Sequence, residues 1–134
     1  MEKYDVVIIG AGPAGIGMSS MLKDFGIKKM LVVEKGKVGQ TFDMWPEEMR
    51  FITPSFTTNF WGQMDLNSIA TGTSPAFTLE TEHPSGKEYA KYLRTLSEHF
   101  ELPIKENTEV ENVEYIDNTS VSYTHLTLPT ICSV

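Results

Sequence analysis

The stretch that decides the fold is Tyr4-Asp5-Val6-Val7-Ile8-Ile9-Gly10-Ala11-Gly12-Pro13-Ala14-Gly15. Its first half, Val6 to Ile9, is continuously apolar and β-branched, which is typical of a parallel strand buried on both of its faces. Its second half spaces three glycines as G-x-G-x-x-G, and apolar residues at helical spacing continue to about Phe25. The stretch therefore predicts a strand, a tight turn and a helix in succession.

A second apolar run supports the same unit. Met30-Leu31-Val32-Val33 ends in Glu34, nineteen residues beyond Gly15. Strand, glycine turn, helix, second strand and terminal acid together form the pattern of a dinucleotide-binding βαβ unit. A GxGxxG string alone is a weak signal, but here the strand, the helix and the acid all stand at the required distances.

Each residue of the turn has a role in this pattern. Gly10 lets the chain turn sharply, Gly12 lets the backbone approach a pyrophosphate, and Gly15 lets the helix pack closely on the strand. Pro13 stands at the first helical position, where its missing N–H costs little. The amides of the first helical turn, with about half a positive charge, would then point at the phosphates.

Glu34 indicates which nucleotide fits. A carboxylate at the end of the second strand accepts hydrogen bonds from both ribose hydroxyls and repels a 2′-phosphate by about 1 to 4 kcal/mol. The adenosine end should therefore be that of FAD or NAD and not that of NADP. The alternative is a tight turn that binds nothing, which three glycines disfavour because they weaken local structure.

Composition excludes several classes of function. The chain of 134 residues is one domain in length, and its net charge of −7, without a basic cluster, disfavours nucleic acid and anionic membranes as partners. Four glycines and a proline argue against a membrane anchor over residues 6–22. A single cysteine, Cys132, provides neither a disulfide framework nor a CxxC pair. Without a signal peptide, we expect a cytoplasmic protein.

The middle of the chain, residues 35–84, is rich in loops and prolines, and a connection of this length is unusual unless it serves a function. Its aromatic residues either pack against a flat ring of a ligand or form a small core of their own, and composition leaves both open. These aromatic residues are Trp45, Phe51, Phe56, Phe60, Trp61 and Phe77.

Beyond residue 84, Ser85 and Glu88 form a capping box that predicts a helix, which Pro103 ends. A pair of strands is expected next, a short one near Ile104 and a longer one over residues 109–116. Residues 121–134 contain no Asp, Glu, Lys or Arg. We therefore expect a domain over residues 1–120 followed by a non-native or disordered tail, with a natural β-rich terminus as the alternative.

The fingerprint at residues 10–15, and the chain as far as Ser120, resemble the N-terminal FAD-binding segment of two-dinucleotide-domain flavoproteins. These are the pyridine nucleotide-disulfide oxidoreductases and flavin-containing monooxygenases. The resemblance implies an α/β fold, a Rossmann-like FAD/NAD(P)-binding domain with a parallel sheet, flanking helices and an added β-meander, here incomplete. The missing part would hold an NAD(P)H domain.

Further motifs indicate which of these two groups of flavoproteins the chain resembles more. Disulfide reductases carry Gly-Gly-Thr-Cys where this chain has Gly39-Gln40-Thr41-Phe42, so that Phe42 replaces the redox cysteine and resembles the tryptophan of the monooxygenase-like branch. The second glycine is replaced by a glutamine, which departs from the family pattern. Thr53 resembles a strand-end threonine beside the flavin, and Val110 resembles a residue whose backbone contacts adenine. Asn59 matches either an asparagine beside the isoalloxazine or an ordinary turn residue.

The resemblance thus implies an FAD-dependent oxidoreductase of monooxygenase-like type, inactive as this chain alone. NAD(P)H would be its co-substrate, and a small molecule or oxygen its partner; the oligomeric state stays open. The alternatives are a thioredoxin-reductase-like enzyme with its cysteines in the missing part, a non-catalytic fragment, or an NAD-dependent dehydrogenase. No catalytic residue is identified, and the scattered histidines 83, 99 and 125 indicate no metal site. The predicted cofactor-binding residues are Gly10, Gly12, Pro13, Ala14, Gly15, Glu34, Lys35, Gln40, Thr41, Phe42, Thr53 and Val110.

Overall fold

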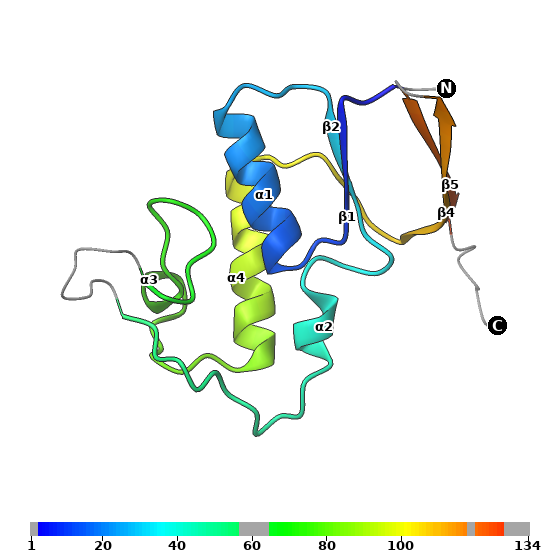
Figure 1. Ribbon diagram of the computed structural model, residues 1–134. Helices are drawn as coiled ribbons and strands as arrows, with labels where there is room; N and C mark the ends of the chain where they lie inside the picture. Colours follow the sequence, from blue (N-terminus) through cyan, green and yellow to red (C-terminus); the bar gives the residue numbers. More distant parts are fainter. Residues whose placement is uncertain (1–2, 57–64, 118–119, 128–134) are drawn as a thin grey trace.

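The two apolar runs form a parallel sheet. In the computed structural model, which describes residues 3–56, 65–117 and 120–127, strand β1 (Val6–Ile9) pairs in parallel with β2 (Met30–Val33). The short strand β3 (Ile104–Lys105) pairs with the other side of β2, which gives the order β1-β2-β3 (Figure 1). Parallel strands need a crossover connection, and a helix provides it between β1 and β2.

Helix α1 (Pro13–Asp24) makes this crossover and begins with Pro13, as the sequence predicts. It ends in a Schellman motif, in which the Ile27 amide donates to Leu22 O (3.0 Å) and the Gly26 amide donates to Lys23 O (2.9 Å). These bonds satisfy carbonyls that the end of a helix leaves without partners. The predicted strand–turn–helix–strand unit is therefore confirmed.

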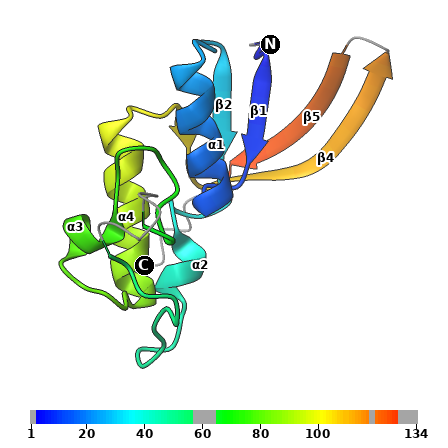
Figure 2. The same ribbon diagram turned by 60° about the vertical axis from the view of Figure 1, so that its left-hand side comes forward.

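Helix α4 (Gly86–His99) lies beside α1, as both views of the molecule show (Figures 1 and 2). The predicted capping box is present, because the Glu88 amide donates to Ser85 Oγ and the Ser85 amide donates to the Glu88 carboxylate. The helix buries its apolar stripe in the main core. The residues of this core are Ala11, Ile16, Val32, Val38, Tyr89, Tyr92, Leu93 and Leu96.

Strand β1 differs from the prediction that it is buried on both faces. Three of its four residues are half-buried, and the fourth, Ile9, is 62% exposed. The reason is its position, since β1 is an edge strand of the sheet that the described residues form. The central strand β2 is buried at three of its four residues and fits the expectation for a continuous apolar run.

The middle of the chain contains two short helices, α2 (Gln40–Asp43) and α3 (Pro75–Leu79). Trp45 and Phe51 stack with a ring-centroid distance of 5.3 Å, and Phe51 lies 4.4 Å from the ring of Tyr89 on α4. For these two residues the structure shows the second alternative, a small aromatic core. Phe56 and Phe77 are exposed, and aromatic residues 60 and 61 lie outside the described residues.

The last two strands pair with each other. Strand β4 (Thr108–Asp117) runs antiparallel to β5 (Ser120–Thr127), and this hairpin extends beyond the parallel sheet (Figure 2). The two strands expected after Pro103 are present, but they belong to different sheets, because Asn107 adopts a positive φ of 52° and turns the chain between β3 and β4. The division of the chain at residue 120 stays a prediction.

Within the part of the chain that the structure describes, no helix is both long and apolar enough to cross a membrane.

Candidate dinucleotide-binding site

The turn between β1 and α1 is shaped by two of its glycines. Gly10 has a φ of 100°, which side chains rarely tolerate, and its amide donates to Val33 O over 2.8 Å. A Cβ at Gly15 would lie 1.9 Å from Gly10 O, so only a glycine lets α1 approach this closely. These contacts give Gly10 and Gly15 structural roles within the protein itself.

Gly12 differs from Gly10 and Gly15. Its backbone is extended, with a φ of −85°, and a Cβ added there would meet nothing within 4 Å. Packing within the described residues therefore gives no reason for a glycine at this position. No side chain of residues 3–56, 65–117 or 120–127 caps α1, and the first amide bonded within the helix is that of Ile16, which donates to Gly12 O (2.9 Å). The preceding amides of Ala14 and Gly15 are therefore at the positive end of the helix, without a helical acceptor.

Glu34 links the turn to the end of β2. One carboxylate oxygen accepts a hydrogen bond from the Ala11 amide (2.7 Å), and the other accepts one from the Gly36 amide (2.8 Å). Each oxygen keeps a further lone pair, so the carboxylate can still accept hydrogen bonds from a ribose. The structure thus places the predicted acid directly beside the glycine turn.

Ala11 also connects the turn to α2. Its carbonyl accepts a hydrogen bond from the Gly39 amide (3.1 Å), and Gly39 has a positive φ of 71° directly before the helix. Sequence reasoning assigned no role to either residue. The available signals were the small size of both residues and the place of Gly39 in the string Gly39-Gln40-Thr41-Phe42; small size lets Ala11 be fully buried and Gly39 pack against Ala90.

Helix α2 carries Gln40, Thr41 and Phe42. Its geometry explains why Gln40 can replace the second glycine of the family's Gly-Gly-Thr-Cys string. The positive φ falls at Gly39, whereas Gln40 is helical and needs no glycine. The Gln40 side chain accepts a hydrogen bond from the Lys37 amide (2.9 Å), and Thr41 is exposed. Phe42 packs between Trp45 and Tyr89, with ring centroids 5.0 Å and 4.9 Å away.

The chain between β3 and β4 lies against the segment that follows β2. The Thr108 amide donates to Glu34 O and the Asn107 amide donates to Gly36 O, both over 2.9 Å. Lys35 forms an ion pair with Glu109 (2.7 Å), and the hydrogen bond to this carboxylate, followed by its charge, raises the pKa of the Lys35 ammonium. Val110 follows Glu109 in β4 and is half-buried.

Thr53 belongs to a different cluster. Its carbonyl accepts a hydrogen bond from the Asn67 side chain (2.8 Å), which also donates to Ser55 Oγ. Asp65 lies buried beside them and accepts hydrogen bonds from the Asn67 amide and from Ser74 Oγ. This polar network was not predicted, and it holds the loop before α3 in place. The predicted residue Asn59 lies outside the described residues.

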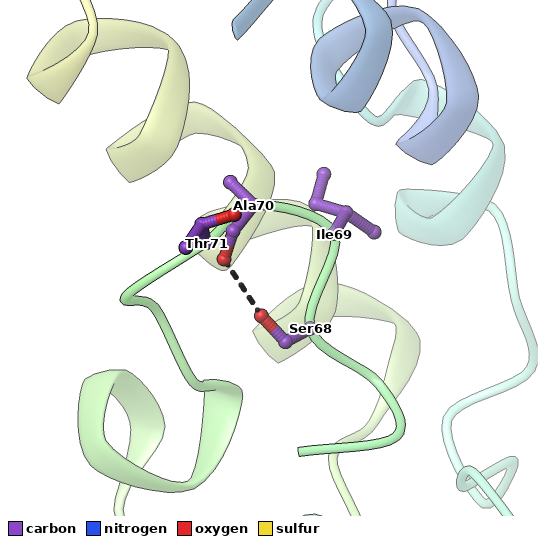
Figure 3. Close-up of a pocket in the computed structure, with 4 residues that line it drawn as sticks. All are labelled: Ser68, Ile69, Ala70 and Thr71. Atoms are coloured by element: carbon purple, nitrogen blue, oxygen red, sulfur yellow. Dashed lines mark hydrogen bonds between the residues drawn. The ribbon is translucent and has the colours of Figure 1, made fainter. Parts of the chain in front are cut away.

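Two cavities lie apart from the predicted site residues. A depression of about 240 Å³ is lined by Ser68, Ile69, Ala70 and Thr71, with the Ser68 hydroxyl directed at Ala70 O (Figure 3). A larger one, of about 560 Å³, lies between the end of α4 and β3. No group of three or more metal-ligating side chains occurs among the residues that the structure describes.

Comparison with protein families identifies one match that covers most of the chain. A family model described as pyridine nucleotide-disulphide oxidoreductase matches residues 7–125. The uncharacterized oxidoreductase CzcO of Bacillus velezensis is 30% identical over 118 residues, which are 86% of this chain and 30% of that protein. The chain therefore spans about 30% of the length of the curated relatives it matches.

Solved structures share the fold. The bacillithiol disulfide reductase Bdr (YpdA) of Staphylococcus aureus superposes with a TM-score of 0.76 at 26% identity, covering 93% of this chain and 34% of the other. A flavin-containing monooxygenase of Stenotrophomonas maltophilia has a TM-score of 0.71 at 16% identity, with the same coverage. OTEMO in complex with FAD and NADP has a TM-score of 0.66 at 23% identity, covering 93% and 23%. The Rossmann-like α/β fold is therefore confirmed.

Proposed function

Because this chain belongs to the pyridine nucleotide-disulphide oxidoreductase family, we propose that it is the FAD-binding part of an NAD(P)H-dependent oxidoreductase of monooxygenase-like type. The observation that carries the proposal is the open space at Gly12 beside the uncapped start of α1. A glycine that no contact among the described residues requires, next to amides that lack a helical acceptor, fits a backbone that receives a diphosphate.

The residues around this turn have separate tasks in the proposal. The amides of Ala14 and Gly15 receive the diphosphate, and Glu34 accepts hydrogen bonds from the ribose while its own amide contacts keep it in place. Gln40, Thr41 and Phe42 are held beside the turn by the contact between Ala11 and Gly39. Bound FAD would supply hydride acceptance from NAD(P)H and electron delivery to oxygen or a small molecule.

The monooxygenase-like assignment rests on Phe42. This ring packs in the aromatic core at the position where a disulfide reductase would carry a redox cysteine, and the chain has only one cysteine. The second candidate is a disulfide reductase whose cysteines lie in another part of a longer protein. The 26% identity to bacillithiol disulfide reductase favours this second candidate.

FAD titration of the purified chain tests the proposal. We expect quenching of flavin fluorescence and yellow protein after desalting. Gly12→Ser is the matched variant, because serine is a favourable N-cap and its side chain has room, so the fold should persist while FAD binding is lost. A colourless wild-type chain that takes up no FAD would support the non-catalytic fragment, and retention of NAD in place of FAD would support the dehydrogenase.

A further inference from the structure

Lys35, which follows Glu34 in the sequence, forms an ion pair with Glu109. The Lys35 ammonium donates to Glu109 Oε1 over 2.7 Å, and the two side chains are 68% and 35% exposed. The pair joins the segment after β2 to the second residue of β4. Backbone bonds on both sides, from Thr108 to Glu34 and from Asn107 to Gly36, keep the two segments in register.

Among the three side chains Glu34, Lys35 and Glu109, the charges sum to −1, and Lys105, whose carbonyl accepts a hydrogen bond from the Glu34 amide, is a further cation on β3. Glu34 and Glu109 each carry one negative charge, and Lys35 carries the one positive charge that lies between them in this contact network. Glu106, in the connection between β3 and β4, accepts a hydrogen bond from the Val38 amide (2.8 Å). A nucleotide with a 2′-phosphate on its ribose would need a cation beside Glu34. Lys35 is the cation that follows Glu34 in the sequence, and it is already paired with Glu109.

We propose that Glu109 is a specificity-determining residue of the adenosine site: by pairing with Lys35 it withholds the ammonium from the ribose and favours an adenosine with a free 2′-hydroxyl. The inference rests on the proposed function, because it concerns the ribose of the same dinucleotide. Glu34 repels a 2′-phosphate directly, whereas Glu109 acts through Lys35 by removing the cation that would offset this repulsion.

The test compares 5′-ADP with 2′,5′-ADP as probes for the full chain, with dissociation constants measured by calorimetric titration. The wild-type chain should prefer 5′-ADP. Glu109→Gln keeps the size of the side chain but frees Lys35, so it should narrow this preference by about threefold to tenfold at low salt. In the double variant Lys35→Met/Glu109→Gln the wild-type preference should return.

Glu111→Gln is the matched control, since it removes the same charge from the exposed surface of β4 without breaking the pair. It should change the preference by less than about twofold, because it leaves the ion pair between Lys35 and Glu109 in place and removes only an exposed charge that salt screens. This comparison separates a specific effect through Lys35 from a general loss of negative charge.

The outcomes distinguish the two proposals. An unchanged preference in Glu109→Gln, an equal change in Glu111→Gln, or a narrowed preference that persists in the double variant overturns the role of Glu109, while FAD binding by the wild-type chain still supports the proposed function. A wild-type chain that binds neither FAD nor 5′-ADP overturns both.

Discussion

The Ala11 amide donates a 2.7 Å hydrogen bond to the Glu34 carboxylate, and this contact joins the glycine turn to the end of β2. The two residues are separated by 23 positions in the sequence. The acid that the motif assigns to a ribose therefore also stabilises the turn that the motif assigns to the phosphates. Substitution of Glu34 should accordingly affect the fold as well as binding.

Glu34→Gln tests this double role. A glutamine offers one acceptor oxygen where the carboxylate has two, so the amide of either Ala11 or Gly36 loses its partner and faces an NH₂ group. We expect a loss of about 1 to 3 kcal/mol in the free energy of unfolding, measured by urea denaturation without any ligand. Wild-type stability in the variant would show that these two bonds do not stabilise the protein.

Gly15→Ala should destabilise the protein because a Cβ would lie 1.9 Å from Gly10 O. The backbone of α1 must then move away from β1, and we expect a cost of about 1 to 3 kcal/mol, or failure to fold. Gly12→Ser is the control, since its Cβ meets nothing within 4 Å and serine is a favourable N-cap residue. Thermal denaturation should show a lower Tm for Gly15→Ala only, and equal losses for both variants would contradict the different roles assigned to the two glycines.

The sequence predicted the parts of the fold that local chemistry determines. The capping box of α4, the proline at the start of α1 and the apolar run of β2 each require only neighbouring residues, and each is confirmed. The exposure of β1 was not predictable in this way, because it depends on whether a further strand lies beside it.

The candidate site also combines features that the local sequence predicts with features that it does not. The glycine turn and Glu34 follow from a motif of fixed spacing, and the structure brings them together. Other contacts join segments that are distant in the sequence through irregular loops. They are the hydrogen bonds of Ala11 to Glu34 and Gly39, the ion pair between Lys35 and Glu109, and the buried network around Asp65. No periodicity or local spacing encodes such contacts, so they required the three-dimensional arrangement.

The capping box makes stability depend on pH. Hydrogen bonds from the Ser85 amide and hydroxyl lower the pKa of the Glu88 carboxyl below its usual value. A lowered pKa in the folded state adds stability that is present above the unfolded pKa, near 4.5, and is lost as the pH falls through the folded pKa. We expect Glu88→Gln to be less stable than the wild type at pH 7, on the order of 0.5 kcal/mol. The difference should shrink between about pH 5 and pH 3 in urea denaturation, and a difference that stays constant over this range would contradict the carboxylate's role.

Tyr89 gives the opposite dependence on pH. Its hydroxyl donates to Asn67 O over 2.8 Å, and burial, with smaller effects of Tyr92 and Asp65, raises the pKa of the Tyr89 phenol. A raised pKa adds stability that is fully present below the unfolded pKa, near 10, and is lost as the pH rises toward the folded pKa. Tyr89→Phe should therefore cost about 1 kcal/mol at pH 7, through the lost hydrogen bond, and the gap to the wild type should narrow above about pH 10. Urea denaturation of the wild type and of Tyr89→Phe at pH 7 and pH 10.5 measures both effects. If the gap at pH 10.5 equals the gap at pH 7, the buried hydroxyl does not control this loss of stability.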